Sequence, residues 1–165
     1  MYNIGIDLGG TNIAAGIVDE NGQILIKHSV PTYKERPTDE IVADMASLAK
    51  KLIAESGLNI TEFSSVGIGC PGTIDSKSGE VVYSNNIPME HYPMAQRFKE
   101  HLNLPVIIDN DANCAALGEY TVNGNEAKVF ILITLGTGVG SGVIINGKIF
   151  HGFNGAAAEL GFFIC

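Results

Sequence analysis

The sequence contains no tryptophan and only three cysteines among its 165 residues. Cys70, Cys114 and Cys165 lie far apart without any C-x-x-C pairing, so no zinc site is visible and we expect reduced thiols. No apolar run approaches the roughly 20 residues that a membrane-spanning helix needs. No basic segment followed by an apolar core marks a secretion signal. We therefore expect a cytoplasmic protein without a membrane partner.

Basic residues are scarce as well. Lysine and arginine together number 10 against 18 acidic residues, which gives a net charge of -8. An acidic protein does not attract nucleic acid or an anionic membrane, so we expect neither as a partner. The net charge does not exclude a local basic pocket that binds a phosphate. Hydrophobic residues make up 45% of the chain, which is typical of a globular protein. The length suits one domain of about 100–150 residues and part of a second.

The apolar pattern of the first 120 residues predicts one complete α/β domain. Three strands are expected at 2–6, 13–18 and 23–30, with Asn-Gly at the tip of the second turn. Helical spacing then predicts a helix that starts with Thr38 as its N-cap and stops at Gly57. Later segments predict a strand at 65–69, a hairpin arm at 80–83, a helix from Pro93, a strand at 105–108 and a helix over 111–120. This order describes a mixed sheet with covering helices.

The opening pattern returns near residue 129. Strands are expected at 130–134, 142–145 and 148–150, again with a glycine turn after the first and an Asn-Gly turn after the second. This internal repeat predicts an N-terminal lobe at 1–122 and the incomplete start of a second lobe at 123–165. The stretch 142–149 comes close to a P-loop, but Ile149 stands where Ser or Thr would bind Mg²⁺, and the pattern reads as a hairpin.

Each copy carries a glycine-rich turn after its first strand. The turns are Asp7-Leu8-Gly9-Gly10-Thr11-Asn12 and Leu135-Gly136-Thr137-Gly138. Glycines let a backbone approach a phosphate closely and direct N–H groups toward it. A carboxylate at Asp7 could hold Mg²⁺ through water. The alternative is a pair of tight hairpin turns without a ligand.

Polar residues gather at 109–113, directly after a predicted strand and at the start of a helix. Open α/β sheets bind ligands at this end of their strands, and a carboxylate there could accept a proton from an attacking alcohol. The alternative is helix capping, which needs only one of the four Asp and Asn residues. Asn85 and Asn86 offer amides suited to sugar hydroxyls, although such a pair alone is more often a turn.

Taken together, these residues resemble the ROK family (repressor, open reading frame, kinase), and most closely its bacterial glucokinases. The motifs run in order through nearly the whole chain: Gly5-Ile6-Asp7-Leu8-Gly9-Gly10-Thr11, Gly69-Cys70-Pro71-Gly72, Asn85-Asn86, Asn110-Asp111-Ala112-Asn113, Leu135-Gly136-Thr137-Gly138 and Gly155-Ala156-Ala157-Ala158-Glu159-Leu160-Gly161. The resemblance implies an actin-like ATPase (ribonuclease H-like) fold. It also implies phosphorylation of a hexose at its 6-hydroxyl, with ATP as donor and Mg²⁺ as the metal.

The resemblance also assigns roles to individual positions. Asp111 is implied as the general base. The implied sugar contacts are Gly72, Asn86, Asn110, Asp111 and Glu159. The implied ATP and phosphate site comprises Asp7, Gly9, Gly10, Thr11, Asn12, Gly136, Thr137 and Gly138, with Asp7 also holding Mg²⁺ through water. Glucose is the expected hexose, ahead of mannose, fructose and N-acetylmannosamine, and a homodimer is left open.

The sequence departs from the family pattern at its end. Phe162 stands where family members carry a histidine, and the zinc cysteines and adenosine-binding elements are missing. We therefore expect a truncated kinase with an unfinished sheet edge that invites pairing or aggregation. The alternative is a sugar-binding module without catalysis. A repressor is set aside, because only six residues precede Asp7 and they leave no room for a DNA-binding segment.

Overall fold

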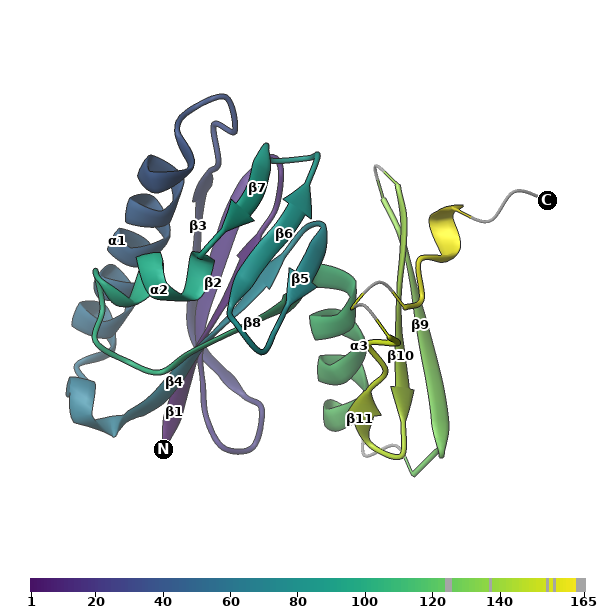
Figure 1. Cartoon of the computed structure of the whole chain (residues 1–165). Helices are drawn as coiled ribbons and strands as arrows, with labels where there is room; N and C mark the ends of the chain where they lie inside the picture. Colours follow the sequence, from purple (N-terminus) through teal and green to yellow (C-terminus); the bar gives the residue numbers. More distant parts are fainter. Residues whose placement is uncertain (124–125, 137, 154, 156, 163–165) are drawn as a thin grey trace. The chain divides into compact units, whose positions relative to one another are not determined.

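The computed structural model describes residues 1–123, 126–136, 138–153, 155 and 157–162. The chain divides into two compact units, Met1–Asp109 and Asn110–Cys165. Figure 1 labels the helices and strands of both units. Each unit is described separately below.

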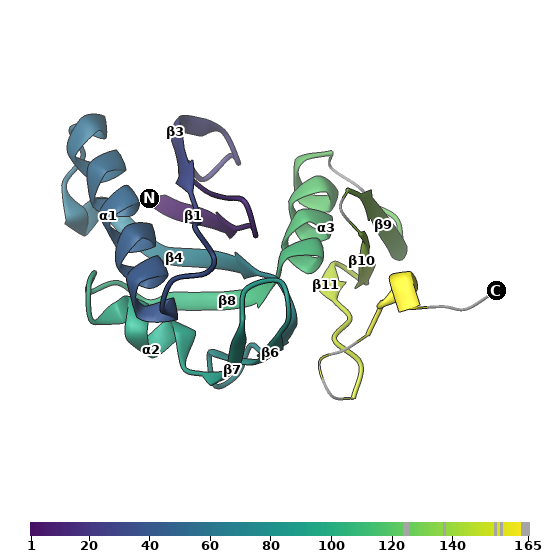
Figure 2. The ribbon, with the colours of Figure 1, turned by 90° about the horizontal axis from the view of Figure 1, so that it is seen from above.

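The first unit is built on a five-stranded sheet with the strand order β3-β2-β1-β4-β8. Its strands are β1 (Tyr2–Leu8), β2 (Asn12–Val18), β3 (Ile24–Pro31), β4 (Phe63–Cys70) and β8 (Val106–Asn110). β1 and β2 are antiparallel, as are β2 and β3, whereas β1 and β4 are parallel. In Figure 2 the arrows of β1, β4 and β8 point the same way, so these three strands end at one edge.

Helix α1 (Thr38–Ser56) packs on β2 and β3 of this sheet, and helix α2 (Met94–Lys99) packs against α1. Alternate residues of β1, namely Ile4, Ile6 and Leu8, are buried and join the apolar stripe of α1 in one core. Helix α1 ends at Gly57, whose φ of 71° is the left-handed cap that glycine favours. Pro37 occupies the N-cap position, so Thr38 is the first helical residue and its prediction as the cap was wrong.

A second, three-stranded sheet completes the first unit. It comprises β5 (Thr73–Asp75), β6 (Glu80–Ser84) and β7 (Met89–Tyr92), paired antiparallel in that order. The sequence predicted only β6, because β5 and β7 are too short to show an alternating pattern. Val81, Ile87 and Met89 are buried and extend the core of the unit. A single 3₁₀ turn, η1 (Ile60–Glu62), leads into β4.

The second unit consists of helix α3 (Asp111–Val122) packed on the sheet β11-β10-β9. Its strands are β9 (Val129–Leu135), β10 (Val139–Ile145) and β11 (Lys148–Ile149), and η2 (Leu160–Phe162) follows. Helix and sheet approach closely at Gly142, where an added Cβ would lie 2.6 Å from both the Ala112 carbonyl oxygen and Ala116 Cβ. Asn146 and Gly147 have φ values of 51° and 77°, so the stretch that resembles a P-loop is a hairpin, as predicted.

The predicted internal repeat is visible in the two larger sheets. β1, β2 and β3 form an antiparallel meander, and so do β9, β10 and β11. The contacts group α3 with the second unit, so the compact units divide after Asp109, whereas the sequence placed a lobe boundary after residue 122. The division into functional lobes at 122 stays a prediction.

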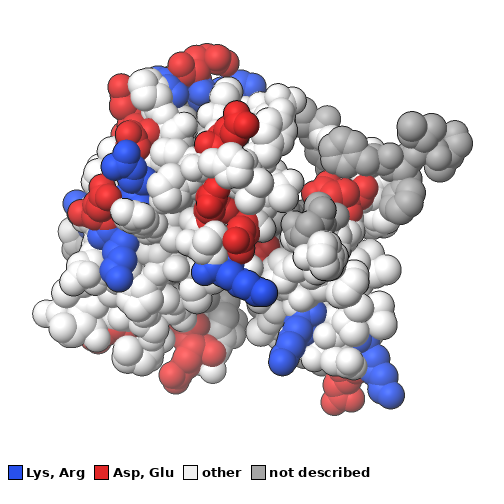
Figure 3. Space-filling view, viewed as in Figure 1, with Lys and Arg blue, Asp and Glu red and all other residues white. Residues whose placement is uncertain are grey.

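The surface shows no concentrated positive charge on the side that Figure 3 presents. Lys and Arg side chains of the described residues are scattered there among acidic and uncharged ones and form no continuous patch. Among the helices that the structure describes, none is both long and apolar enough to cross a membrane.

Candidate active site

The turn between β1 and β2 has a tightly closed backbone. The amide of Gly9 donates to the Asn12 carbonyl oxygen over 3.0 Å, and a Cβ on Gly9 would lie only 2.9 Å from that oxygen. Gly10 has open space where a side chain would stand, so a ligand can approach its backbone. Asp7, Thr11 and Asn12 are exposed around the turn. The predicted phosphate residues of the first unit thus lie together at the end of β1.

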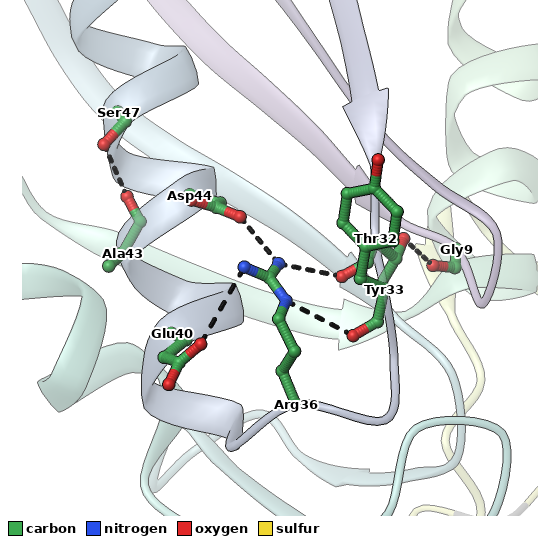
Figure 4. Close-up of polar contacts among 8 residues, drawn as sticks. All are labelled: Gly9, Thr32, Tyr33, Arg36, Glu40, Ala43, Asp44 and Ser47. Carbon is green, nitrogen blue, oxygen red and sulfur yellow. Dashed lines mark hydrogen bonds and ion pairs between the residues drawn. The ribbon is translucent and has the colours of Figure 1, made fainter.

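Thr32, which directly follows β3, anchors this turn, although no sequence pattern marks it. Its side chain is fully buried, its Oγ1 donates to the Gly9 carbonyl over 2.6 Å, and its amide donates to the Thr11 carbonyl over 2.9 Å. Arg36 in turn donates to the Thr32 carbonyl over 3.0 Å and pairs with Asp44 of α1 at 2.6 Å (Figure 4). The glycine turn is therefore tied to the segment that leads into α1. A lone threonine in a loop gives no sequence signal of such a role.

We expect Thr32→Val to destabilise the first unit by about 1–3 kcal/mol, because valine keeps the shape but leaves the buried Gly9 carbonyl without its donor. Urea denaturation followed by circular dichroism measures this loss. The matched control is Thr38→Val, since the Thr38 hydroxyl makes no hydrogen bond within the described part of the chain, and a change within about 0.5 kcal/mol is expected there. Equal losses in both variants would contradict the anchoring role.

Gly72 lies against the end of β6, where the two predicted asparagines follow. Its φ is 104°, and a Cβ would overlap the Tyr83 carbonyl oxygen and lie 2.9 Å from Ser84 Cα. Ser84 is 2% exposed, and its hydroxyl has no hydrogen-bond partner among the described residues. Asn86 is exposed two residues farther along. The structure therefore places Gly72 against the end of β6, two residues before Asn86, and a sugar-binding role of both stays a prediction.

The N-terminus of α3 carries Asn110 and Asp111. The Asn110 side chain accepts hydrogen bonds from the amides of Ala112 (2.9 Å) and Asn113 (3.2 Å), so it is the N-cap of the helix. The Asp111 carboxylate accepts from the Ala112 amide over 2.8 Å and is hydrogen-bonded by the Asn110 side chain. Capping thus explains Asn110 but leaves Asp111 as a carboxylate held in a fixed place at the helix start.

Two carboxylates of the second unit have perturbed acidities. Desolvation raises the pKa of Asp111 above its ordinary value of 3.8, although its backbone hydrogen bonds and Asn110 act in the opposite direction. Desolvation also raises the pKa of Glu159, and the negative charge of Asp111 adds to this rise. The structure thus places Glu159 within electrostatic reach of Asp111, with part of each side chain still exposed to solvent.

The second glycine turn joins β9 to β10. The amide of Gly136 donates to the Gly138 carbonyl over 3.0 Å, which closes the turn, while Thr137 lies outside the described residues. The site residues therefore fall into two sets. The first unit holds Asp7, Gly9, Gly10, Thr11, Asn12, Gly72 and Asn86, and the second holds Asn110, Asp111, Gly136, Gly138 and Glu159. Across the described ranges, no group of three or more His, Cys, Asp or Glu side chains forms a metal cluster.

Two antiparallel meanders, one in each unit and each with a glycine turn after its first strand, are typical of the actin-like ATPase class of fold. Solved structures confirm the class. A ROK family glucokinase from Streptomyces griseus in complex with glucose and AMPPNP superposes with a TM-score of 0.89 at 39% identity, covering 99% of this chain and 50% of that one. A ROK hexokinase from Thermus thermophilus superposes with a TM-score of 0.84 at 34% identity, covering 100% of this chain and 54% of that one.

The chain belongs to the ROK family, whose model matches residues 3–165. A glucokinase of Streptomyces coelicolor is 42% identical over 159 residues, which are 96% of this chain and 48% of that protein. A glucokinase of Halalkalibacterium halodurans is 39% identical over 161 residues, which are 97% and 49%. The chain therefore spans about half the length of the relatives it matches.

Proposed function

We propose that this chain carries the hexose site and the phosphate turns of an ATP-dependent hexose kinase, with glucose as the hexose. The observation that carries the proposal is the Asp111 carboxylate, which the Ala112 amide and the Asn110 side chain hold at the start of α3. The similarity to glucokinases, one of them solved with glucose and AMPPNP, supports both substrates.

Asp111 has the properties that a general base for a sugar hydroxyl needs. Its raised pKa makes its carboxylate a better proton acceptor. In the proposed reaction its oxygen accepts the proton of the hexose 6-hydroxyl while that hydroxyl oxygen forms its new bond to the γ-phosphorus of ATP, and the bond from this phosphorus to the bridging oxygen breaks, so that ADP leaves. Asn110 orients Asp111 through its hydrogen bond. Glu159, Gly72 and Asn86 are proposed to hold the remaining sugar hydroxyls.

The turn at residues 7–12 fits a phosphate, because Gly10 leaves its backbone uncovered and Thr32 fixes the Gly9 carbonyl from behind. Asp7 is exposed beside the turn and offers the carboxylate oxygen that Mg²⁺ prefers. When bound, Mg-ATP supplies the phosphoryl group and the metal neutralises its charge. We propose that Gly136, Thr137 and Gly138 form the second phosphate turn.

The proposed location of the protein is the cytoplasm, and its proposed assembly is a homodimer.

A second function is favoured by one observation. All of the proposed hexose contacts lie within residues 3–165, which the family model matches. The alternative that we propose is a module that binds a hexose without transferring a phosphoryl group. Hexose binding without ATP consumption separates this module from the kinase.

The test is the release of ADP by the purified chain with Mg-ATP, measured with and without glucose. We expect glucose-dependent release in the wild type and in Glu119→Gln, which removes an exposed carboxylate from the other end of α3. We expect its loss in Asp111→Asn. Calorimetric binding of glucose with no ADP release would favour the binding module, and a folded chain that shows neither would contradict the proposed function.

A further inference from the structure

Ser141 of β10 makes hydrogen bonds to the backbone of both chain neighbours of Glu159. Its side chain is 6% exposed, and its Oγ donates to the Ala158 carbonyl oxygen and accepts from the Leu160 amide at 3.3 Å. A serine hydroxyl carries one donor and two acceptor sites, so both bonds can exist at once. Ala158 and Leu160 are the two chain neighbours of Glu159. One buried hydroxyl thus fixes the backbone on which the Glu159 side chain stands.

Two further features show that this segment lies in one place against β10. Ala158 has a φ of 67°, a conformation that an L-residue other than glycine rarely adopts and that its surroundings must hold. Gly161 packs against the Val139 carbonyl oxygen at the start of β10, where a Cβ would overlap it. The segment around Glu159 is therefore held at Ala158, Leu160 and Gly161, each time against residues of β10.

The same strand supports the helix that carries Asp111. Gly142, the next residue of β10, meets the first turn of α3 at Ala112, which directly follows Asp111. β10 therefore holds Asp111 through helix packing and Glu159 through Ser141. Because both residues are held by the same strand, the negative charge of Asp111 acts on Glu159 and contributes to its raised pKa.

We infer that Ser141 is a positioning residue that fixes Glu159 beside Asp111 and so gives the hexose site its paired carboxylates. The inference rests on the proposed function, in which Glu159 and Asp111 both face the hexose. Ser141 itself acts through the backbone of Ala158 and Leu160. Without this hydroxyl, Ala158 and Leu160 lose their hydrogen bonds to Ser141 and the packing of Gly161 on Val139 remains, so the Glu159 side chain is held less firmly near Asp111.

The test follows the Glu159 carboxyl carbon by NMR during a pH titration of the whole chain. In Ser141→Ala we expect the pKa of Glu159 to fall toward its ordinary value of 4.5, because the Asp111 charge and the desolvation both weaken. In Ser141→Thr, which retains the hydroxyl, the pKa is expected to stay raised. If Ser141→Ala unfolds the unit, Ser141→Cys keeps a similar volume with weaker hydrogen bonds and carries the same expectation.

Thr121→Ala is the matched control. The Thr121 hydroxyl also donates to a backbone carbonyl, that of Leu117 at 2.7 Å, but at the far end of α3. A Glu159 pKa that is unchanged in folded Ser141→Ala, or that falls equally in Thr121→Ala, would overturn the inference.

Glucose affinity is measured in parallel by calorimetry. We expect a loss of roughly tenfold in Ser141→Ala, the equivalent of one hydrogen bond, with recovery in Ser141→Thr. A fall of the Glu159 pKa in a chain whose wild type binds no hexose would support the positioning role while contradicting the proposed function. The Glu159 pKa therefore tests the positioning role of Ser141, and hexose binding by the wild type tests the proposed function.

Discussion

Replacing Gly72 with alanine is expected to destabilise the first unit by about 2–6 kcal/mol, since overpacking and backbone strain each cost about 1–3 kcal/mol. Gly72 has a φ of 104°, which is strained for any residue with a Cβ. The new methyl would also overlap the Tyr83 carbonyl oxygen and press on Ser84, both of which belong to β6. Since backbone atoms cannot move aside alone, β6 must shift, and with it the segment that leads to Asn86.

Urea denaturation of the wild type and Gly72→Ala measures this effect as a change in the midpoint of unfolding. Gly5→Ala is the matched control, because Gly5 also lies in the first unit but has no atom within 4 Å of an added Cβ. We expect its unfolding free energy to change by about 0.5 kcal/mol or less. A Gly72→Ala protein as stable as the Gly5→Ala protein would show that the close approach of Gly72 to β6 does not exist.

Asp111→Asn is expected to reduce hexose-dependent turnover by about 10²–10⁴-fold, the usual contribution of a general base. The amide keeps the size of the side chain and can still accept the hydrogen bond from Ala112, so the start of α3 stays formed. It cannot accept a proton from the attacking hydroxyl. Initial-rate kinetics with Glu119→Gln as the control measure the loss, and an equal effect of the two substitutions would rule out the role of Asp111 as base.

The same residue predicts a pH dependence with a defined sign. Turnover requires ionised Asp111, so its rate is expected to rise through a pKa above 3.8 and to level off beyond it. Because the folded state holds this proton more tightly than the unfolded state, ionised Asp111 makes folding less favourable above that pKa. Asp111→Asn is therefore expected to unfold at no lower a temperature than the wild type at pH 7. Thermal unfolding followed by circular dichroism checks this, and a clearly lowered midpoint would contradict the desolvation of Asp111.

Long elements of the fold could be predicted because their apolar residues follow a clear period. The apolar run at 2–6 predicted β1, which extends to Leu8 in the structure, and the helical spacing from Ile41 to Leu52 predicted α1. β5 and β7 were missed because three or four residues cannot show a period above noise. The cap of α1 was misplaced because Thr38 suits the N-cap position chemically, whereas proline has no side-chain acceptor to signal it.

The residues of the candidate site also divide into those that the sequence predicted and those that it did not. Asp111 and the glycine turns were visible because several polar or glycine residues stand together after predicted strands. Thr32 and Ser141 were not, since each is a single hydroxyl whose partner lies 23 or 17 residues away along the chain. Such contacts exist only in the folded tertiary structure, so no local sequence pattern predicts them. The roles of Gly72, Asn86 and Glu159 at a sugar stay predictions, although the structure gives Gly72 and Glu159 defined places.

Phosphorus NMR of the purified chain with Mg-ATP and glucose tests the central claim most directly, because it identifies the product of phosphoryl transfer. The proposed function predicts a phosphomonoester signal, that of a hexose 6-phosphate, which grows with ADP and is absent without glucose and in Asp111→Asn. Unchanged ATP, or conversion of ATP to inorganic phosphate regardless of glucose, in a folded sample would contradict the claim that this chain phosphorylates a hexose.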